Sequence, residues 1–375
     1  MAIQKIPGRA IKLGNDTIGD VAYFDGTTWQ RLAIGTVGEV LTMNEAGTYP
    51  TWGTTWQFQG DYNGYSLGGN ENNAPYNLNF DVIERNSYAS DTNSVDVGDL
   101  TSVKFAIASS WKSMTHGYAA GGYAHYNNPG GGPGGVTSAY EATIEKFSFA
   151  SSSNGVDTAD LTATWEYGGG CSSANNCYIA GGSHSGTRTD TINKFVKSSE
   201  ANATDIGDLV VPTGPPFASS STDHGYLAGG TDSNGPVPDA AHNVIQRFSF
   251  ASGTQNADDV GDLNTATWAG AAGSSLTHGY IACGYNHSNQ SSNRIEKYSF
   301  ASSANATQIG TMTVARGNET LGGTSSTTHG YAAGGIQPGV GTCTIIDKYS
   351  FVTDANATDV GDLTSRKTSV SGTQN

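Results

Sequence analysis

The sequence predicts an all-β fold, and three observations in its 375 residues lead to this expectation. A short segment around a tyrosine recurs six times, with Tyr at positions 65, 118, 178, 226, 280 and 331. The chain has 51 Gly, about twice the usual share, while only 14 % of its residues are charged. No apolar pattern with the helical period of about 3.6 residues persists along the chain. These features favour many short strands joined by tight turns.

Each repeat contains the same motifs in the same order. The Tyr segment reads His-Gly-Tyr-x-Ala-Gly-Gly at 116–122, and Ile-x-(Lys/Arg)-(Phe/Tyr)-Ser-Phe follows, as at 144–149. The unit closes with Asp-(Val/Ile)-Gly-Asp-Leu, as at 96–100, and a run rich in Ser, Ala and Gly then leads into the next Tyr segment. Four short segments in about 50 residues, repeated six times, are typical of a six-bladed β-propeller.

The end of the chain predicts how the propeller closes. Residues 363–372 match the lead-in run, but no Tyr segment follows them. We therefore expect this last strand to join the segment around Tyr65, because that pairing removes two open sheet edges. A seventh blade that uses residues 56–60 as an extra lead-in is the alternative. The expected domains are an N-terminal arm, 1–55, and the propeller, 56–375.

The Gly-Gly doublet after a short apolar strand, together with the period of about 50 residues, resembles kelch-type propellers. The resemblance covers residues 56–375. The Trp that kelch repeats carry late in each unit is absent, and Trp111, Trp165 and Trp268 lie in the lead-in run instead. The resemblance implies a kelch-like six-bladed propeller.

The N-terminal arm lies outside the repeat and predicts short strands at 21–24, 29–32 and 39–43. Its segments 19–32, 35–42 and 50–53 resemble a module found in tail-fibre and other structural proteins of tailed bacteriophages, including cyanophages. The resemblance implies a virion protein whose residues 1–55 dock on other virion proteins. A small hairpin cap over one propeller face is the alternative. The docking residues that we expect are Tyr23, Trp29, Leu32 and Trp52.

Composition and motifs exclude several classes of function. A net charge of -15 repels phosphate backbones, so we expect no nucleic-acid partner. No apolar run is long enough to predict a membrane span. The sequence contains no G-x-S-x-G elbow, HExxH motif or phosphate loop. We therefore expect no catalytic residues, no cofactor and no metal site.

The best candidate binding residues lie between the Gly-Gly doublet and the Ile-x-Lys motif, where the repeats differ in length and sequence. Repeat proteins place such insertions on one face, which is often the binding face. Aromatic, His and Arg side chains in these stretches suit stacking on sugars and hydrogen bonding to them. The candidates are Tyr76, Tyr123, His125, Tyr126, His184, Arg188, His242, Tyr285 and His287.

Several other residues recur at fixed repeat positions, and we assign them structural roles. His116, His224, His278 and His329 are expected in turns rather than in a metal site. We expect the recurring Asp residues to hold turn amides or to pair with the recurring basic residues. Calcium at Asp96 and Asp99 and a Cys171–Cys177 bridge are alternatives. The acidic set is Asp99, Asp160, Asp208, Asp262 and Asp362, and the basic set is Arg85, Lys146, Lys194, Arg247, Lys297 and Lys348.

Together these features predict a virion fibre or appendage protein whose propeller loops recognise a host-surface glycan or envelope protein. A purely architectural capsid, neck or tail decoration protein is the first alternative. A glycan-degrading propeller enzyme is the second, because carboxylates are plentiful. A homo-oligomer, such as the trimer common among phage fibres, is compatible with the sequence.

Overall fold

The computed structural model describes residues 17–35, 40–43, 48–53, 56–71, 78–127, 136–232, 241–251, 256–286, 288, 290–317 and 320–375. The regular structure in these ranges is β-strand, and they contain no helix long and apolar enough to cross a membrane. The chain divides into two compact units, Met1–Trp56 and Gln57–Asn375.

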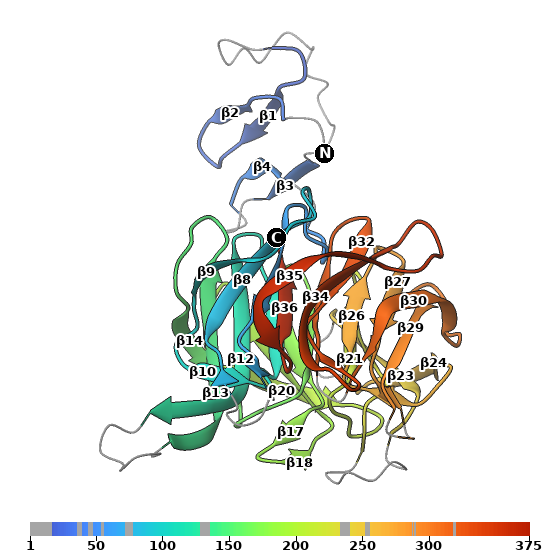
Figure 1. Ribbon diagram of the computed structural model, residues 1–375. Coiled ribbons are helices and arrows are strands. Elements are labelled where there is room, and N and C mark those ends of the chain that lie inside the picture. The colour runs from blue at the N-terminus through green and yellow to red at the C-terminus, as the bar shows by residue number, and fades with distance from the viewer. Residues whose placement is uncertain are drawn as a thin grey trace. The chain divides into compact units, whose positions relative to one another are not determined.

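The second unit is a six-bladed β-propeller (Figure 1) in which each blade is an antiparallel sheet. Blade 1 contains β36 (Ser371–Gln374), β5 (Asn63–Leu67), β8 (Val82–Ser87) and β9 (Val95–Asp99). Blade 2 contains β10 (Val103–Phe105), β11 (Ser109–Lys112), β12 (His116–Asn127), β13 (Val136–Ser148) and β14 (Val156–Asp160). Blade 3 contains β15 (Gly169–Ser172), β16 (Asn176–Ala180), β19 (Thr191–Val196) and β20 (Thr204–Asp208).

The other three blades follow the same order, from the innermost strand to the outermost. Blade 4 contains β21 (Phe217–Ser220), β22 (His224–Ala228), β23 (Val244–Ser249) and β24 (Asp258–Asp262). Blade 5 contains β26 (Ala271–Ser274), β27 (His278–Ala282), β29 (Ser292–Ser299) and β30 (Thr307–Arg316). Blade 6 contains β31 (Gly322–Ser325), β32 (His329–Ala333), β34 (Gly341–Ser350) and β35 (Thr358–Lys367).

The C-terminal strand completes the first blade, as its sequence predicted. β36 pairs with β5 in a register that places Ser371 opposite Leu67. The expected seventh-blade alternative is wrong, because residues 57–60 do not add a strand to a new blade. Instead, Gly60 donates its N–H to the Ser325 carbonyl, and the Gln59 side-chain amide donates to the carbonyl of Ser274. This segment therefore lies among the innermost strands.

The Ser, Ala and Gly-rich runs surround the propeller axis. The innermost strands of neighbouring blades contact one another in turn around the ring. A side chain added to Gly372 would place its Cβ 2.3 Å from the Gly323 carbonyl oxygen, and one on Gly323 would lie 2.3 Å from that of Ala272. The Tyr segments form the second strand of each blade, one strand away from the axis.

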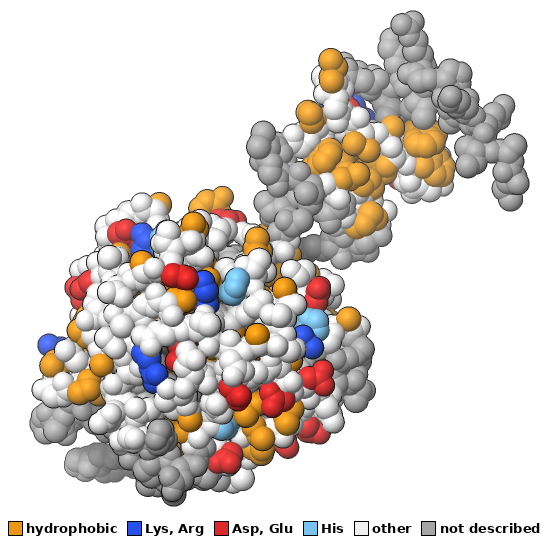
Figure 2. All heavy atoms as spheres, turned by 90° about the vertical axis from the view of Figure 1, so that its right-hand side faces the viewer, with side chains coloured by type: hydrophobic (Ala, Val, Ile, Leu, Met, Phe, Trp, Pro, Cys, Tyr) orange, Lys and Arg blue, Asp and Glu red, His pale blue; other side chains and the backbone are white. Residues whose placement is uncertain are grey.

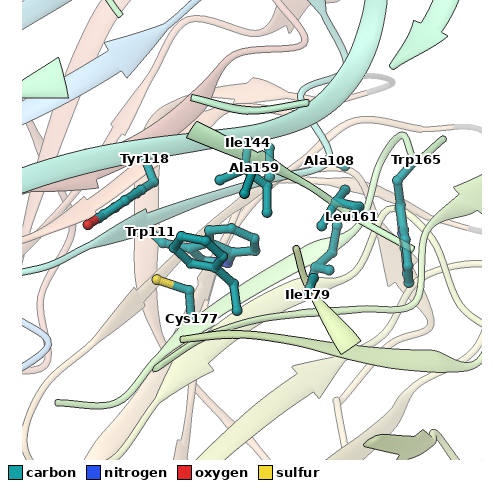
Figure 3. Close-up of a cluster of buried hydrophobic side chains, with 12 residues drawn as sticks. Ala108, Trp111, Tyr118, Ile144, Ala159, Leu161, Trp165, Cys177 and Ile179 are labelled. Carbon is teal, nitrogen blue, oxygen red and sulfur yellow. The ribbon is translucent and has the colours of Figure 1, made fainter. Parts of the chain in front are cut away.

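Aromatic packing between blades explains the recurring tyrosines. The Tyr178 ring stacks on Phe250 with centroids 4.7 Å apart, and Tyr280 stacks on Phe351 at 4.5 Å. Between blades 2 and 3 the buried Trp111, Tyr118 and Cys177 contribute to one apolar cluster (Figure 3). Burial of such rings against the next blade is a large source of stability.

An asparagine fastens each blade to the next at the outer rim. The Asn202 side-chain oxygen accepts the Asp160 N–H at 3.1 Å, and the following Ala203 N–H donates to the Asp160 carbonyl at 2.8 Å. All six blade junctions make this pair of hydrogen bonds, which we call the rim clasp. Its asparagines are Asn93, Asn154, Asn202, Asn256, Asn305 and Asn356.

A buried polar side chain follows the recurring Ile in every third strand. These residues are Glu84, Glu145, Asn193, Gln246, Glu296 and Asp347. Each accepts a main-chain N–H from the segment that leads from the outer-strand motif of the preceding blade into its own blade. We call this segment the connector; its first residues are the last residues of β30 and β35 where it leads into blades 6 and 1. Three of the acids also bind a buried cation from that connector, in the pairs Lys367–Glu84, Lys104–Glu145 and Arg316–Asp347.

The charge at this position is matched blade by blade. Where the connector carries Trp165 or Thr213 in place of a cation, the third strand carries the amides of Asn193 and Gln246. Blade 5 differs, because Thr267 occupies the cation position opposite Glu296. Arg294 approaches that carboxylate only to 3.9 Å, and burial raises the pKa of Glu296.

The N-terminal unit consists of two hairpins in its described part. β1 (Val21–Phe24) pairs with β2 (Trp29–Leu32), and β3 (Val40–Met43) pairs with β4 (Pro50–Gly53). The Asp25 carboxylate accepts the N–H groups of Thr27 and Thr28 in the first turn. The strands expected at 21–24 and 29–32 are confirmed, and the third is confirmed from residue 40, since Glu39 lies outside the described residues.

Candidate functional site

The connections between the second and third strands lie together at one end of the propeller, which we call the loop end. Each blade is antiparallel in chain order, so these connections share an end with the connectors that lead into the next blade. The turns between the first two strands and between the last two share the opposite end, the turn end. In Figure 1 the long hairpin of β12 and β13 and the hairpin of β17 (Ser183–His184) and β18 (Thr187–Arg188) project from the loop end.

A second, shorter ladder continues every blade into the loop end. In each blade, the residue that follows the Gly-Gly position pairs with a residue of the connector. That connector residue lies five positions after the Leu or Met that ends the outer-strand motif. These six loop-end pairs are Asn70–Thr368, Tyr123–Phe105, Ser183–Glu166, Thr231–Gly214, Tyr285–Trp268 and Ile336–Gly317. Equivalent backbone positions therefore carry aromatic, acidic, hydroxyl, aliphatic and glycine residues in different blades.

Two predicted binding residues belong to aromatic pairs in this ring. The Tyr123 ring lies 5.4 Å from Phe105 and 4.9 Å from Tyr140, measured between centroids. The Tyr285 ring lies 5.4 Å from Trp268. Tyr123 and Tyr285 are half-buried, so part of each ring still reaches the surface.

His242 holds its own loop in place. Its Nε2 lies 2.8 Å from the Thr213 hydroxyl, and that hydroxyl donates to the Gly229 carbonyl. Because the Thr213 proton is already used, His242 Nε2 is the donor in this hydrogen bond. Burial lowers the pKa of His242, so the ring stays neutral near pH 7.

His184 and Arg188 support the β17–β18 hairpin. The His184 ring packs edge-on against Trp165 with centroids 4.2 Å apart. The Arg188 guanidinium donates to the Ser183 hydroxyl at 2.6 Å. Burial lowers the pKa of both side chains. These contacts lie within one blade and its connector.

Four other predicted binding residues are only partly described or not described. Tyr76 and His287 lie outside the described residues. The backbones of His125 and Tyr126 belong to β12 and pair with Ser138 and Thr137, but their side chains are not described. The binding role of the nine loop residues therefore stays a prediction.

Sequence patterns alone did not identify the residues that the connectors and the third strands bring to the loop end. Phe105, Glu166 and Trp268 come from connectors, and Tyr140 comes from β13. Burial and the nearby Glu166 carboxylate both raise the pKa of Tyr140. The sequence signal for the connector residues was their shared position, five residues after Leu100, Leu161 and Leu263.

The recurring histidines form turns, as expected. The His116 N–H donates to the Ser113 hydroxyl at 2.9 Å, and its Nδ1 lies 2.9 Å from the Thr115 hydroxyl. Among the described residues, no group of three His, Cys, Asp or Glu side chains could hold a metal ion, including the Asp96 and Asp99 pair suggested for calcium. The suggested Cys171–Cys177 bridge is wrong, because both thiols are free and buried.

The predicted Asp set takes part in the blade junctions through its main-chain N–H groups, not its carboxylates. The carboxylate that holds a turn amide is the first Asp of its motif, as when Asp96 accepts the Gly98 N–H at 3.1 Å. Lys297 and Lys348 pair with Asp354 at 2.6 Å and Asp91 at 2.8 Å, in a loop of the next blade. The expected Lys–Asp pairs therefore exist, but their acids are outside the predicted Asp set.

A cavity of about 90 Å³ lies on the propeller axis. It is lined by small residues of the innermost strands, such as Gly170, Ala218 and Gly323, and by Phe58. Since one liquid water occupies about 30 Å³, this volume corresponds to about three waters. We therefore place the candidate site on the loop end rather than on the axis.

The expected docking residues of the N-terminal unit lie on its hairpins. Tyr23 stacks on Tyr49 with centroids 6.5 Å apart, and the Trp52 indole N–H donates to the Ala33 carbonyl. Trp29 is 46 % exposed beside Phe24, while Leu32 is half-buried. Hydrophobic side chains gather on the surface of this unit (Figure 2), where Phe24, Leu41 and Met43 are also exposed.

Comparison with known proteins supports the fold and gives no information on activity or ligand. No family model and no curated protein matches the chain. The solved structure of YjhT, a propeller protein, matches with a TM-score of 0.59 and 10 % sequence identity, over 79 % of this chain and 97 % of that one. The fold is a six-bladed β-propeller. At this identity the likeness shows the shared architecture and carries nothing about activity or ligand.

Proposed function

We propose that this chain is a virion fibre or appendage protein of a tailed phage whose kelch-like propeller recognises the host surface through its loop end. The observation that carries the proposal is the two-ended organisation of the propeller. The second and third strands of each blade, which flank each variable stretch in the sequence, are joined at the loop end. The chain enters the propeller at the turn end, where Gly60 binds Ser325 and Tyr62 binds Asn375.

The N-terminal unit is the proposed attachment to the particle, through contacts with other virion proteins. Its resemblance to tail-fibre modules supports this role. So does the exposed apolar surface of its two hairpins, because an isolated two-stranded hairpin is only marginally stable in water. A homo-oligomer is part of the proposal, since several copies would add weak contacts through avidity.

The test of recognition compares the two ends of the propeller in assembled particles. We expect the double variant Tyr123→Ala/Tyr285→Ala to reduce host adsorption at least about tenfold, a loss of about 1.4 kcal/mol. The matched control is Met114→Ala/Leu276→Ala, which removes two exposed side chains from turns at the opposite end. Equal adsorption by both variants and the wild type would favour the architectural alternative.

Docking and catalysis are tested separately. Deletion of residues 1–53 should remove the protein from particles while the propeller still folds, as shown by its thermal transition. Incorporation of the truncated protein would contradict the docking role. New reducing ends after incubation of the full chain with host polysaccharide would show an enzyme and overturn the proposal of binding without catalysis.

A further inference from the structure

We propose that a neutral sugar residue binds at the loop end between blades 2 and 3, on the rings of Phe105, Tyr123 and Tyr140 beside Glu166. The inference rests on the proposed recognition function and makes it more specific. It names one of the six loop-end pairs as the contact and an uncharged glycan as the ligand class.

The three rings form a row across neighbouring strands. Phe105 on β10 is opposite Tyr123 on β12, and Tyr123 is opposite Tyr140 on β13, so all three side chains share one face of the sheet. Their centroids lie 5.4 and 4.9 Å apart, and each side chain is half-buried. A row of partly exposed rings offers apolar area for the C–H face of a sugar ring.

Polar groups border this row on the side of blade 3. A Cβ added to Gly186 would lie 3.5 Å from the Tyr140 hydroxyl, so that hydroxyl reaches the turn of the β17–β18 hairpin. Glu166 is fixed by two main-chain hydrogen bonds with Ser183, of 3.0 and 2.8 Å. A carboxylate and a phenol beside the rings can accept and donate hydrogen bonds to sugar hydroxyls.

The charge around the site favours an uncharged ligand. The Glu166 carboxylate interacts by charge with the Arg188 guanidinium, and the carboxylates of Asp190 and Asp205 interact by charge with His184. Three carboxylates and one guanidinium leave this group acidic on balance. The chain as a whole carries a net charge of -15. A uronic acid or another anionic sugar would meet repulsion here that a neutral hexose does not.

Blade 5 shows which features are specific to the row of rings in blade 2. Its pair, Trp268 and Tyr285, has the same backbone position and a similar ring separation. The strand partner of Tyr285 is Ser291 rather than a third aromatic residue. The next connector carries Gly317 at the position of Glu166. Blade 5 thus has the aromatic pair without the third ring and the acid.

The test measures sugar binding to the full chain by saturation-transfer difference NMR. The probes are methyl β-D-glucopyranoside, N-acetylglucosamine and glucuronic acid. We expect at least one neutral probe to bind and glucuronic acid to bind at least about tenfold more weakly. Tyr140→Ala and Glu166→Gln should each weaken the neutral probe about tenfold, while Leu276→Ala, in an exposed turn at the turn end, should change its affinity less than about twofold. Tyr140→Phe keeps the ring and should lose less affinity than Tyr140→Ala.

Three results would overturn the inference. These are no binding of either neutral probe, binding of glucuronic acid as tight as that of the neutral sugars, and a loss with Leu276→Ala as large as with Tyr140→Ala. Equal thermal transitions of the variants show that they remain folded.

Particle adsorption separates this inference from the proposed function. If the Tyr123→Ala/Tyr285→Ala particles lose adsorption but no sugar binds, host recognition stands and the glycan site falls. If the sugar binds at blade 2 while adsorption is unaffected, the site stands and the recognition role falls.

Discussion

The outer rim and the loop end of the propeller are built from the same six repeats, yet they differ in how far the copies have diverged. At the rim every junction uses an asparagine in the same clasp, including Asn202 and Asn305. At the loop end equivalent positions carry Phe105, Glu166 and Gly317. The contact between two blades therefore uses the same residue type at every junction. The loop end has no such contact to preserve, so its side chains can differ from blade to blade.

The largest expected effect on stability comes from the buried ion pairs that join the connectors to the third strands. Lys367→Met leaves the Glu84 carboxylate buried without its cation, which should lower the free energy of unfolding by about 3–5 kcal/mol. The double variant Lys367→Met/Glu84→Gln should recover most of this loss, because blades 3 and 4 already combine an uncharged connector residue with an amide. Chemical denaturation measures both. A double variant no more stable than the single one would contradict the charge matching.

A smaller effect is expected at the rim. Asn202→Ala removes the acceptor of the Asp160 N–H and should cost about 1 kcal/mol. Asn305→Ala removes the same clasp at another junction and should cost a similar amount. Thermal unfolding of the two variants measures the difference. Costs that differ severalfold would show that the six junctions are not energetically equivalent.

Blade 5 allows the charge matching of the buried third-strand residues to be tested by pH. The pKa of Glu296 is raised in the folded state, so the folded protein holds its proton more tightly than the unfolded chain. The contribution of Glu296 to stability should therefore fall as pH rises from its ordinary pKa of 4.5 through the raised pKa. Glu296→Gln should stabilise the protein at pH 7 by about 1 kcal/mol or less, and the gain should disappear on acidification. Glu84→Gln is the control and should destabilise at pH 7, since Lys367 would lose its partner.

The smallest effect on stability is expected at the loop end. Ser185→Ala, in the turn of the β17–β18 hairpin, should change the free energy of unfolding by less than about 0.5 kcal/mol, because this side chain is exposed. Thermal unfolding checks this expectation. A loss as large as that of Asn202→Ala would remove the contrast between loop end and rim.

The fold could be predicted because the repeat carries it. The spacing of Tyr65 and its five equivalents gave the blades, and the unpaired C-terminal run gave the closure that the β36–β5 register confirms. The innermost strands were harder to place, because their Ser, Ala and Gly residues have low strand propensity and owe their position to close packing at the axis.

The buried ion pairs between connectors and third strands could not be predicted from local sequence. Lys367 and Glu84 are separated by 283 residues and meet only because the ring closes. Similarly, the candidate site joins Phe105 with Tyr140 and brings Glu166 from the next connector. The sequence identified Tyr123 because it lies in a variable loop, but its partners lie in other segments whose roles depend on the blade geometry.

The measurement that tests the central claim most directly is the orientation of the propeller on an intact particle, determined by cryo-electron microscopy. We expect the β17–β18 hairpin and the β12–β13 hairpin to point away from the particle, with residues 17–53 against other virion proteins. A loop end buried against another virion protein, with the turn end exposed, would contradict it.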